Sequence, residues 1–115
     1  MVRVDGLLDT GATGTGVRAD LAAELALKPK GRRRVLTANG DIMATEYLFR
    51  IGFVCGRIDD PAFSPETILP FVLEREFPVF ELNGQFPYAV LIGMDVIGLG
   101  DLSIARNGSA ILTLY

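Results

Sequence analysis

Two apolar segments that each run into a glycine constrain this chain more than any other feature. Near the N-terminus, Leu7-Leu8 continues as Asp9-Thr10-Gly11-Ala12-Thr13, so an apolar strand delivers one carboxylate to a tight turn flanked by hydroxyl groups. Far along the chain, Val90-Leu91-Ile92-Gly93-Met94-Asp95 is a second apolar strand, whose glycine permits close approach of another backbone. Asp9 is therefore a candidate functional residue, and Ile92-Gly93 is a place where another backbone could pass close by.

The composition limits the chemistry of such a site. The 115 residues suffice for a single domain, 1–115, and half of them are apolar, which is ample for a compact core. No histidine is present, so imidazole metal sites, Ser-His-Asp triads and Cys-His dyads are excluded. The single cysteine, Cys55, cannot form an intrachain disulfide, and we expect it to be a small buried hydrophobe.

Charge and hydropathy exclude further classes of partner. The net charge is −3, and the basic cluster Arg32-Arg33-Arg34 is local, so we expect a solvated start of a strand and no nucleic-acid surface. The first residues lack the apolar core of a signal peptide. The longest apolar stretch, Tyr88 to Leu99, is too short and too interrupted to span a bilayer. We therefore expect no membrane segment and a cytoplasmic location.

Periodicity and turn residues predict a mostly β chain with one clear helix and one or two short ones. The helix is expected over 17–27, where Val17, Leu21 and Leu25 form one apolar stripe. Asn39-Gly40 and Asn107-Gly108 each predict a hairpin turn, since both turn residues can adopt positive φ. The other expected elements are strands at 1–8, 71–73, 79–82 and 88–92, hairpin arms within 34–53 and at 102–105 and 110–114, helical turns at 64–66 and 95–99, and a turn at 83–84.

The ordered set of these features, from Leu7 to about Leu114, resembles the retropepsin-like aspartic proteases. The terminal hairpin is similar to that of the single-domain bacterial and ubiquitin-shuttle-protein branch, in which the terminal strands build the sheet at the dimer interface. The resemblance implies a small closed barrel of retropepsin type, with one lobe per chain. Because the chain has one Asp-Thr-Gly, it further implies a homodimer in which two Asp9 carboxylates activate water to hydrolyse a polypeptide substrate, without metal or organic cofactor.

The same resemblance implies roles for the residues around Asp9. The Thr10 hydroxyl would reach across the dimer to the partner's loop, and Gly11 would direct its N–H towards the carboxylate. Ala12 is small and apolar where the two-domain pepsins usually have a serine, which implies a milder pH optimum. Thr13 stands where many retroviral enzymes have an aspartate that binds the substrate backbone, so substrate anchoring is expected to differ in detail.

Four further expectations follow from the resemblance. The strand that ends in Ile92-Gly93 is implied to lie under the Asp9 site. Ala38-Asn39-Gly40-Asp41 is the candidate tip of a flap that closes over substrate. Asp95 is expected to begin a short helix, where a carboxylate favours the helix N-terminus, and not to act in catalysis. Relatives usually have about two strands before Asp-Thr-Gly, so part of the N-terminal hairpin is expected to be missing here.

Two alternatives remain at this stage. One is a catalytically inactive dimerisation or peptide-binding module on the same fold, which the short N-terminus favours. The other is a phosphate-binding turn, because Asp9 to Gly16 resembles the nucleotide-phosphate turn of actin-like sugar kinases, although 115 residues cannot supply their two large domains. Oligomeric state tests the first alternative, and nucleotide-dependent stabilisation tests the second.

Overall fold

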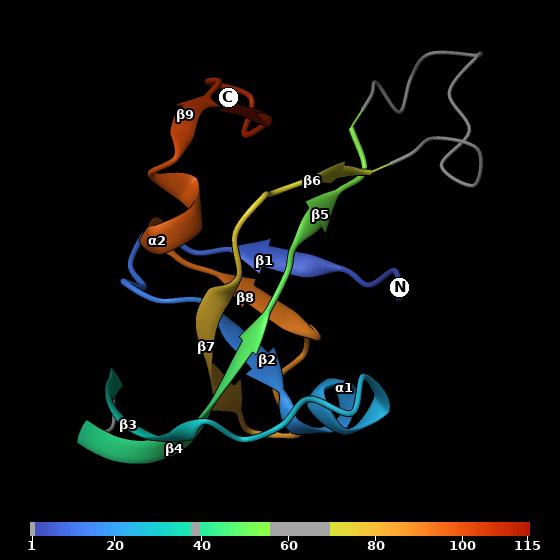
Figure 1. The fold of residues 1–115 in the computed structure, drawn as a ribbon. Coiled ribbons are helices and arrows are strands. Elements are labelled where there is room, and N and C mark those ends of the chain that lie inside the picture. Colours follow the sequence, from blue (N-terminus) through green and yellow to red (C-terminus); the bar gives the residue numbers. More distant parts are fainter. Residues whose placement is uncertain (1, 38–39, 56–69) are drawn as a thin grey trace.

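The computed structural model describes residues 2–37, 40–55 and 70–115. The chain is mostly β, as predicted, with two short helices (Figure 1). The elements in order are β1 (Gly6–Leu8), β2 (Gly16–Arg18), α1 (Ala19–Glu24), β3 (Gly31–Thr37), β4 (Gly40–Phe49), β5 (Gly52–Phe53), β6 (Phe71–Val72), β7 (Phe77–Leu82), β8 (Val90–Ile92), α2 (Met94–Ile97), β9 (Gly100–Ile104) and β10 (Ala110–Leu114).

The main sheet has six strands in the order β1-β8-β2-β7-β4-β3, and β5/β6 and β9/β10 form two separate two-stranded sheets. The pairs β1/β8 and β2/β7 are parallel, and the others are antiparallel. The expected closed barrel is wrong in this respect, because the six-stranded sheet is open. Its edge strands are β1, which pairs only with β8, and β3, which pairs only with β4, so the two edges do not meet among the described residues.

Several elements in the first half of the chain differ in extent from the predicted ones: the return arm expected over 42–53 is divided into β4 and β5, and two others are shorter. The strand expected over 1–8 is confined to Gly6–Leu8. The helix expected over 17–27 is shorter, because Val17 lies in β2, where it pairs with Glu81 of β7 and Val90 of β8. Backbone pairing on both sides therefore overrides the helical period at this residue. The helix spans Ala19–Glu24, and Ala26 beyond it has a φ of 52°.

The two predicted hairpins are present. In the first, β3 pairs with β4 from Gly31↔Glu46 to Thr37↔Gly40, and Gly40 has a φ of 107°, which a residue with a side chain rarely adopts. The second joins β9 to β10. The expected strands at 71–73, 79–82 and 88–92 correspond to β6, β7 and β8, and the short helix at 95–99 corresponds to α2. The helical turn expected at 64–66 lies outside the described residues.

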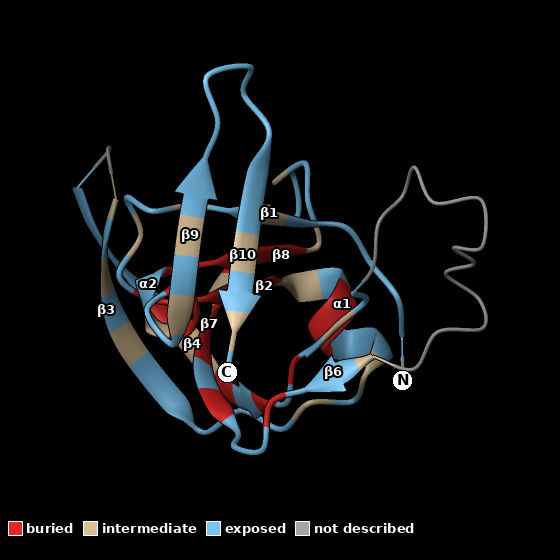
Figure 2. Cartoon of the chain, turned by 90° about the horizontal axis from the view of Figure 1, so that it is seen from above, coloured by how far each residue is buried: buried red, intermediate tan, exposed pale blue. Residues whose placement is uncertain are grey.

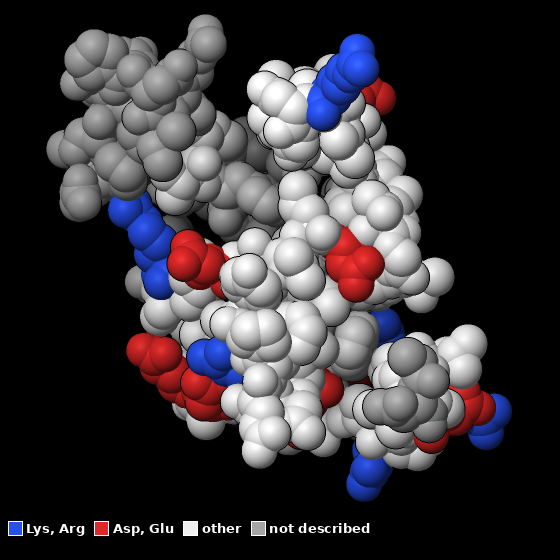
Figure 3. Space-filling model, turned by 180° about the vertical axis from the view of Figure 1, so that it is seen from behind, with Lys and Arg blue, Asp and Glu red and all other residues white. Residues whose placement is uncertain are grey.

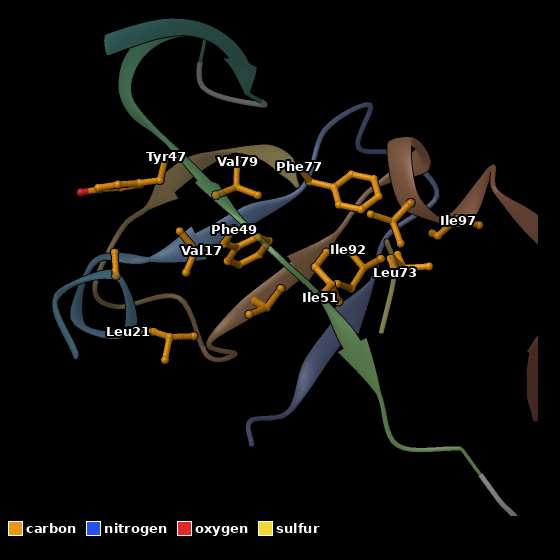
Figure 4. Close-up of a cluster of buried hydrophobic side chains, with 13 residues drawn as sticks. Val17, Leu21, Tyr47, Phe49, Ile51, Leu73, Phe77, Val79, Ile92 and Ile97 are labelled. Atoms are coloured by element: carbon orange, nitrogen blue, oxygen red, sulfur yellow. The ribbon is translucent and has the colours of Figure 1, made fainter. Parts of the chain in front are cut away.

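The two faces of the main sheet carry different side chains, because neighbours along a strand alternate between faces. One face holds the larger core, in which Val17, Phe77, Val79 and Ile92 pack with α1 and α2 (Figure 4). The other face carries a smaller cluster whose buried members are Ala44, Phe80, Leu82 and Leu91. Burial is concentrated in the centre of the sheet, whereas the β9–β10 hairpin is mostly exposed (Figure 2).

Candidate active site

Asp9 directly follows β1 at the end of the parallel pair with β8. Its backbone N–H donates to the carbonyl of Ile92 at 2.9 Å, which continues the β1/β8 ladder by one residue. Leu7 pairs with Leu91, so strand alternation places Asp9 on the same face as these two residues. The carboxylate of this half-buried residue therefore belongs to the face with the smaller cluster, the Asp9 face, and not to the main core.

The turn after Asp9 folds back onto its carboxylate. The Gly11 N–H donates to Asp9 Oδ1 at 2.9 Å, and the Ala12 N–H donates to the Asp9 carbonyl at 3.2 Å. A Cβ on Gly11 would lie 3.2 Å from Asp9 Oδ1, a tight contact, so glycine leaves the carboxylate accessible. Thr10 and Thr13 are exposed, whereas Ala12 packs against the smaller cluster. The expected Gly11 hydrogen bond is thus present.

Gly93 lies against the underside of this loop. The Met94 N–H donates to the Ala12 carbonyl at 2.8 Å, and the Asp95 N–H donates to the Thr13 carbonyl at 3.2 Å. A Cβ on Gly93 would lie 2.6 Å from the Gly14 carbonyl carbon and 3.0 Å from the Ala12 oxygen. Since real Cβ atoms do not approach backbone so closely, a side chain at this position is incompatible with the observed contact.

A buried hydroxyl that was not predicted from the sequence joins the same two segments. Thr15 is fully buried, and its Oγ1 donates to Asp95 Oδ1 at 2.7 Å while accepting from the Gly93 N–H at 3.1 Å. Asp95 also accepts from the Val96 N–H; it lies in the first turn of α2, which begins one residue before the expected start, at Met94. The sequence signal that could have identified Thr15 is its position between Gly14 and Gly16, next to an apolar strand. A hydroxyl that is buried there needs a hydrogen-bond partner.

Arg33 approaches the loop from the other side. Its guanidinium lies 5.4 Å from the centre of the Phe80 ring, and Nη1 contacts Glu46 Oε2 at 3.4 Å. A Cβ on Gly14 would overlap Arg33 Nη2, so the guanidinium occupies the space of the missing side chain. The expected solvated basic cluster is therefore wrong for Arg33, although the Arg34 side chain is 76% exposed.

The β3–β4 hairpin carries the candidate flap. Gly40 and Asp41 are exposed at the start of β4, and Ala38 and Asn39 lie outside the described residues. Large apolar side chains near this end are exposed, including Leu36 at 81% and Met43 at 52%. Basic side chains project around the same hairpin, at the lower right of Figure 3. Exposed apolar groups on a projecting hairpin are suited to contact a bound chain.

Two hollows lined by described residues have volumes of about 560 and 340 Å³, and Asp9 lines neither of them. No group of metal-ligating side chains is found in the described part of the chain. The expected burial of Cys55 is wrong, because the residue is exposed. None of the described helices is long and apolar enough to cross a membrane.

The comparison with known families bears on the loop described above. Residues 2–64, just over half of the chain, match the model of the aspartyl protease family. The chain belongs to this family. The match includes the Asp9 turn and the whole β3–β4 hairpin, whereas β8 and Gly93 lie beyond it. No curated protein and no solved structure matches the chain significantly.

Proposed function

We propose that this aspartyl protease family member is a retropepsin-like endopeptidase that acts as a homodimer, with one Asp9 from each chain. The observation that carries the proposal is the Asp9 carboxylate itself, which accepts the Gly11 N–H at 2.9 Å while Gly93 braces the loop from below. The hydrogen bond orients one oxygen, and the bracing fixes the backbone, so the carboxylate is preorganised before substrate binds.

The chemistry requires two such carboxylates. Two aspartates about 3 Å apart cannot both ionise, as in aspartic proteases generally, so the pair shares one proton. The ionised member removes a proton from water as the water attacks the peptide carbonyl, and the protonated member donates to the carbonyl oxygen. One chain supplies a single Asp-Thr-Gly turn, so a two-fold axis between two copies of Asp9 completes the site.

Several exposed apolar groups support an association between copies. The β9–β10 hairpin extends from the body of the molecule, and Ile104 and Ile111 on it are 69% and 68% exposed (Figure 2). Tyr115 at the chain end is 81% exposed. Burying such side chains is favourable, at roughly 25 cal/mol per Å² of apolar surface. We propose that this hairpin contributes to the dimer interface.

The open face near Asp9 suits an extended polypeptide. The β3–β4 hairpin would close over it as a flap, and backbone hydrogen bonds would hold it as an added strand. A phosphate-binding role for the loop is less consistent with the geometry. The N–H groups of Gly11 and Ala12 donate within the loop to Asp9, so they are not directed at an anion.

The decisive experiment compares cleavage of a diverse unfolded-peptide library by the wild-type chain, Asp9→Asn and Asp5→Asn. Asp5 is exposed and lies outside the turn, so its variant matches the charge change without touching the site. Activity is measured from about pH 3 to 7, where carboxylate pairs titrate, with the oligomeric state determined in parallel. We expect cleavage from a dimer that Asp9→Asn abolishes and Asp5→Asn retains.

The inactive binding module is the alternative. A dimer that binds peptides without cleaving them at any pH tested would favour it, and cleavage that survives Asp9→Asn would refute the catalytic assignment. A monomer without cleavage would show that this chain does not assemble the pair of carboxylates.

A further inference from the structure

Arg33 is a charged residue that lies against Gly14, in the loop after Asp9, on the Asp9 face. The register shows why it belongs to this face. Arg33 pairs with Ala44, and Ala44 is a buried member of the smaller cluster together with Phe80 and Leu91. Leu91 pairs with Leu7, and Asp9, two residues after Leu7, lies on the same face of the sheet because side chains alternate along a strand. A basic side chain and the candidate catalytic carboxylate therefore share one side of the sheet.

The surroundings hold the guanidinium in place without covering it. The guanidinium lies over the Phe80 ring, and its Cζ is 5.4 Å from the ring centre. Its Nη2 atom occupies the space beside Gly14. The Arg33 side chain is 29% exposed, and Glu46 is its hydrogen-bond partner among the described residues, through Nη1 at 3.4 Å. A guanidinium has five N–H donors, so donors remain for an incoming carboxylate.

The segment from Asp9 to Gly16 has no charged residue besides Asp9. Thr13 and Gly14 provide no acidic side chain to compete with substrate for Arg33, and Gly14 makes room for the guanidinium. The distance from Arg33 Nη1 to Glu46 Oε2 is 3.4 Å, which is long for a hydrogen bond, so a substrate carboxylate could replace Glu46 as the partner of Arg33.

We propose that Arg33 is a specificity-determining residue that binds an acidic side chain of the peptide lying along the Asp9 face. This inference rests on the proposed function, since it takes the ligand to be an extended polypeptide. In a two-fold dimer each chain supplies one Arg33, so the preference applies at one position on either side of the bond that is cleaved. Arginine suits this role because its planar fork binds a carboxylate through two parallel hydrogen bonds.

The test is a matched peptide series in which each position carries in turn Glu or its neutral counterpart Gln. For the wild-type chain we expect kcat/KM to be about tenfold higher for Glu at the position that Arg33 contacts, the ratio typical of one charge-assisted hydrogen bond. Arg33→Met should abolish this ratio, and Arg33→Lys should restore part of it. Arg34→Met removes the same charge from an exposed neighbour and should leave the ratio unchanged.

Glu46→Gln separates recognition from a purely structural role. If Arg33 binds substrate, weakening its internal partner should raise the Glu-to-Gln ratio. If Arg33 only ties the β3–β4 hairpin to the loop, Glu46→Gln should lower activity on all peptides equally, and that result would overturn the proposal. This variant keeps the guanidinium and its stacking on Phe80, so the test survives if Arg33→Met fails to fold.

Failure of this inference is distinguishable from failure of the proposed function. Cleavage that requires Asp9 but shows no Glu preference, or one unchanged in Arg33→Met, would refute the role of Arg33 alone. If no variant cleaves, fluorescence anisotropy with labelled Glu and Gln peptides measures binding directly. Tighter binding of the Glu peptide that disappears in Arg33→Met would support recognition without catalysis, and equal binding of both peptides would refute it.

Discussion

Substitution of Gly93 by alanine tests whether close backbone contact holds the Asp9 loop in place. An added Cβ would lie 2.6 Å from the Gly14 carbonyl carbon, whereas ordinary contacts begin at 3.4 Å, so buried backbone must move by nearly 1 Å. Such overpacking costs about 1–3 kcal/mol. The same movement weakens the hydrogen bond from the Gly93 N–H to Thr15 Oγ1, which contributes about 1 kcal/mol. The expected loss is therefore about 2–4 kcal/mol of the free energy of unfolding.

The φ angle of Gly93 is −93°, an ordinary value, so this loss would arise from the contact and not from backbone strain. Urea denaturation of the wild-type chain and the variant measures it as a lower midpoint with an unchanged slope. Gly84→Ala is the matched control, because a Cβ at Gly84 would meet nothing within 4 Å. A Gly93→Ala variant within about 0.5 kcal/mol of the wild type, the range of ordinary surface changes, would refute the reasoning. An equal loss in Gly84→Ala would do the same.

Three further predictions concern neighbouring parts of the fold. Thr15→Val should lower the free energy of unfolding by about 2 kcal/mol in urea denaturation, since it removes a buried donor to Asp95, and retention of wild-type stability would contradict the network. Burial and the hydrogen bond to Glu81 raise the pKa of Tyr47, so the folded state disfavours its phenolate. The stability that this shift provides is present below the unfolded pKa of about 10 and is lost as pH rises above it. Tyr47→Phe should remove this part of the alkaline decline in unfolding experiments, and an unchanged decline would argue against it. Ile111→Asp should raise the dissociation constant of the proposed dimer by about tenfold or more in analytical ultracentrifugation, because a charge would replace an apolar side chain at the proposed interface, and an unchanged constant would exclude Ile111 from that interface.

The local features around Asp9 follow from neighbouring residues in the chain. The apolar residues before Asp9 and the glycine at position 11 predicted a strand that ends in a tight turn, and the Gly11 N–H does bond the carboxylate. The hairpins at 31–49 and 100–114 were predictable because Asn-Gly turns are local signals. The need for glycine at position 93 was also predictable, since an apolar strand that ends in glycine suggests a close backbone approach.

Other features depend on contacts between distant segments and were not predictable from local sequence. Val17 continued a helical stripe in the sequence, but pairing with β7 and β8 made it a strand residue. The bond between Thr15 and Asp95 joins residues 80 positions apart, and neither residue reveals its partner locally. In the sequence, Arg33 is indistinguishable from the arginines on either side of it. In the folded sheet, its guanidinium lies beside Gly14 and over the Phe80 ring. Hydrophobic periodicity indicates which face of a helix or strand is apolar, but it does not indicate which strands pair with one another. The residues that surround Asp9 come from strand pairing, so they could not be predicted from periodicity.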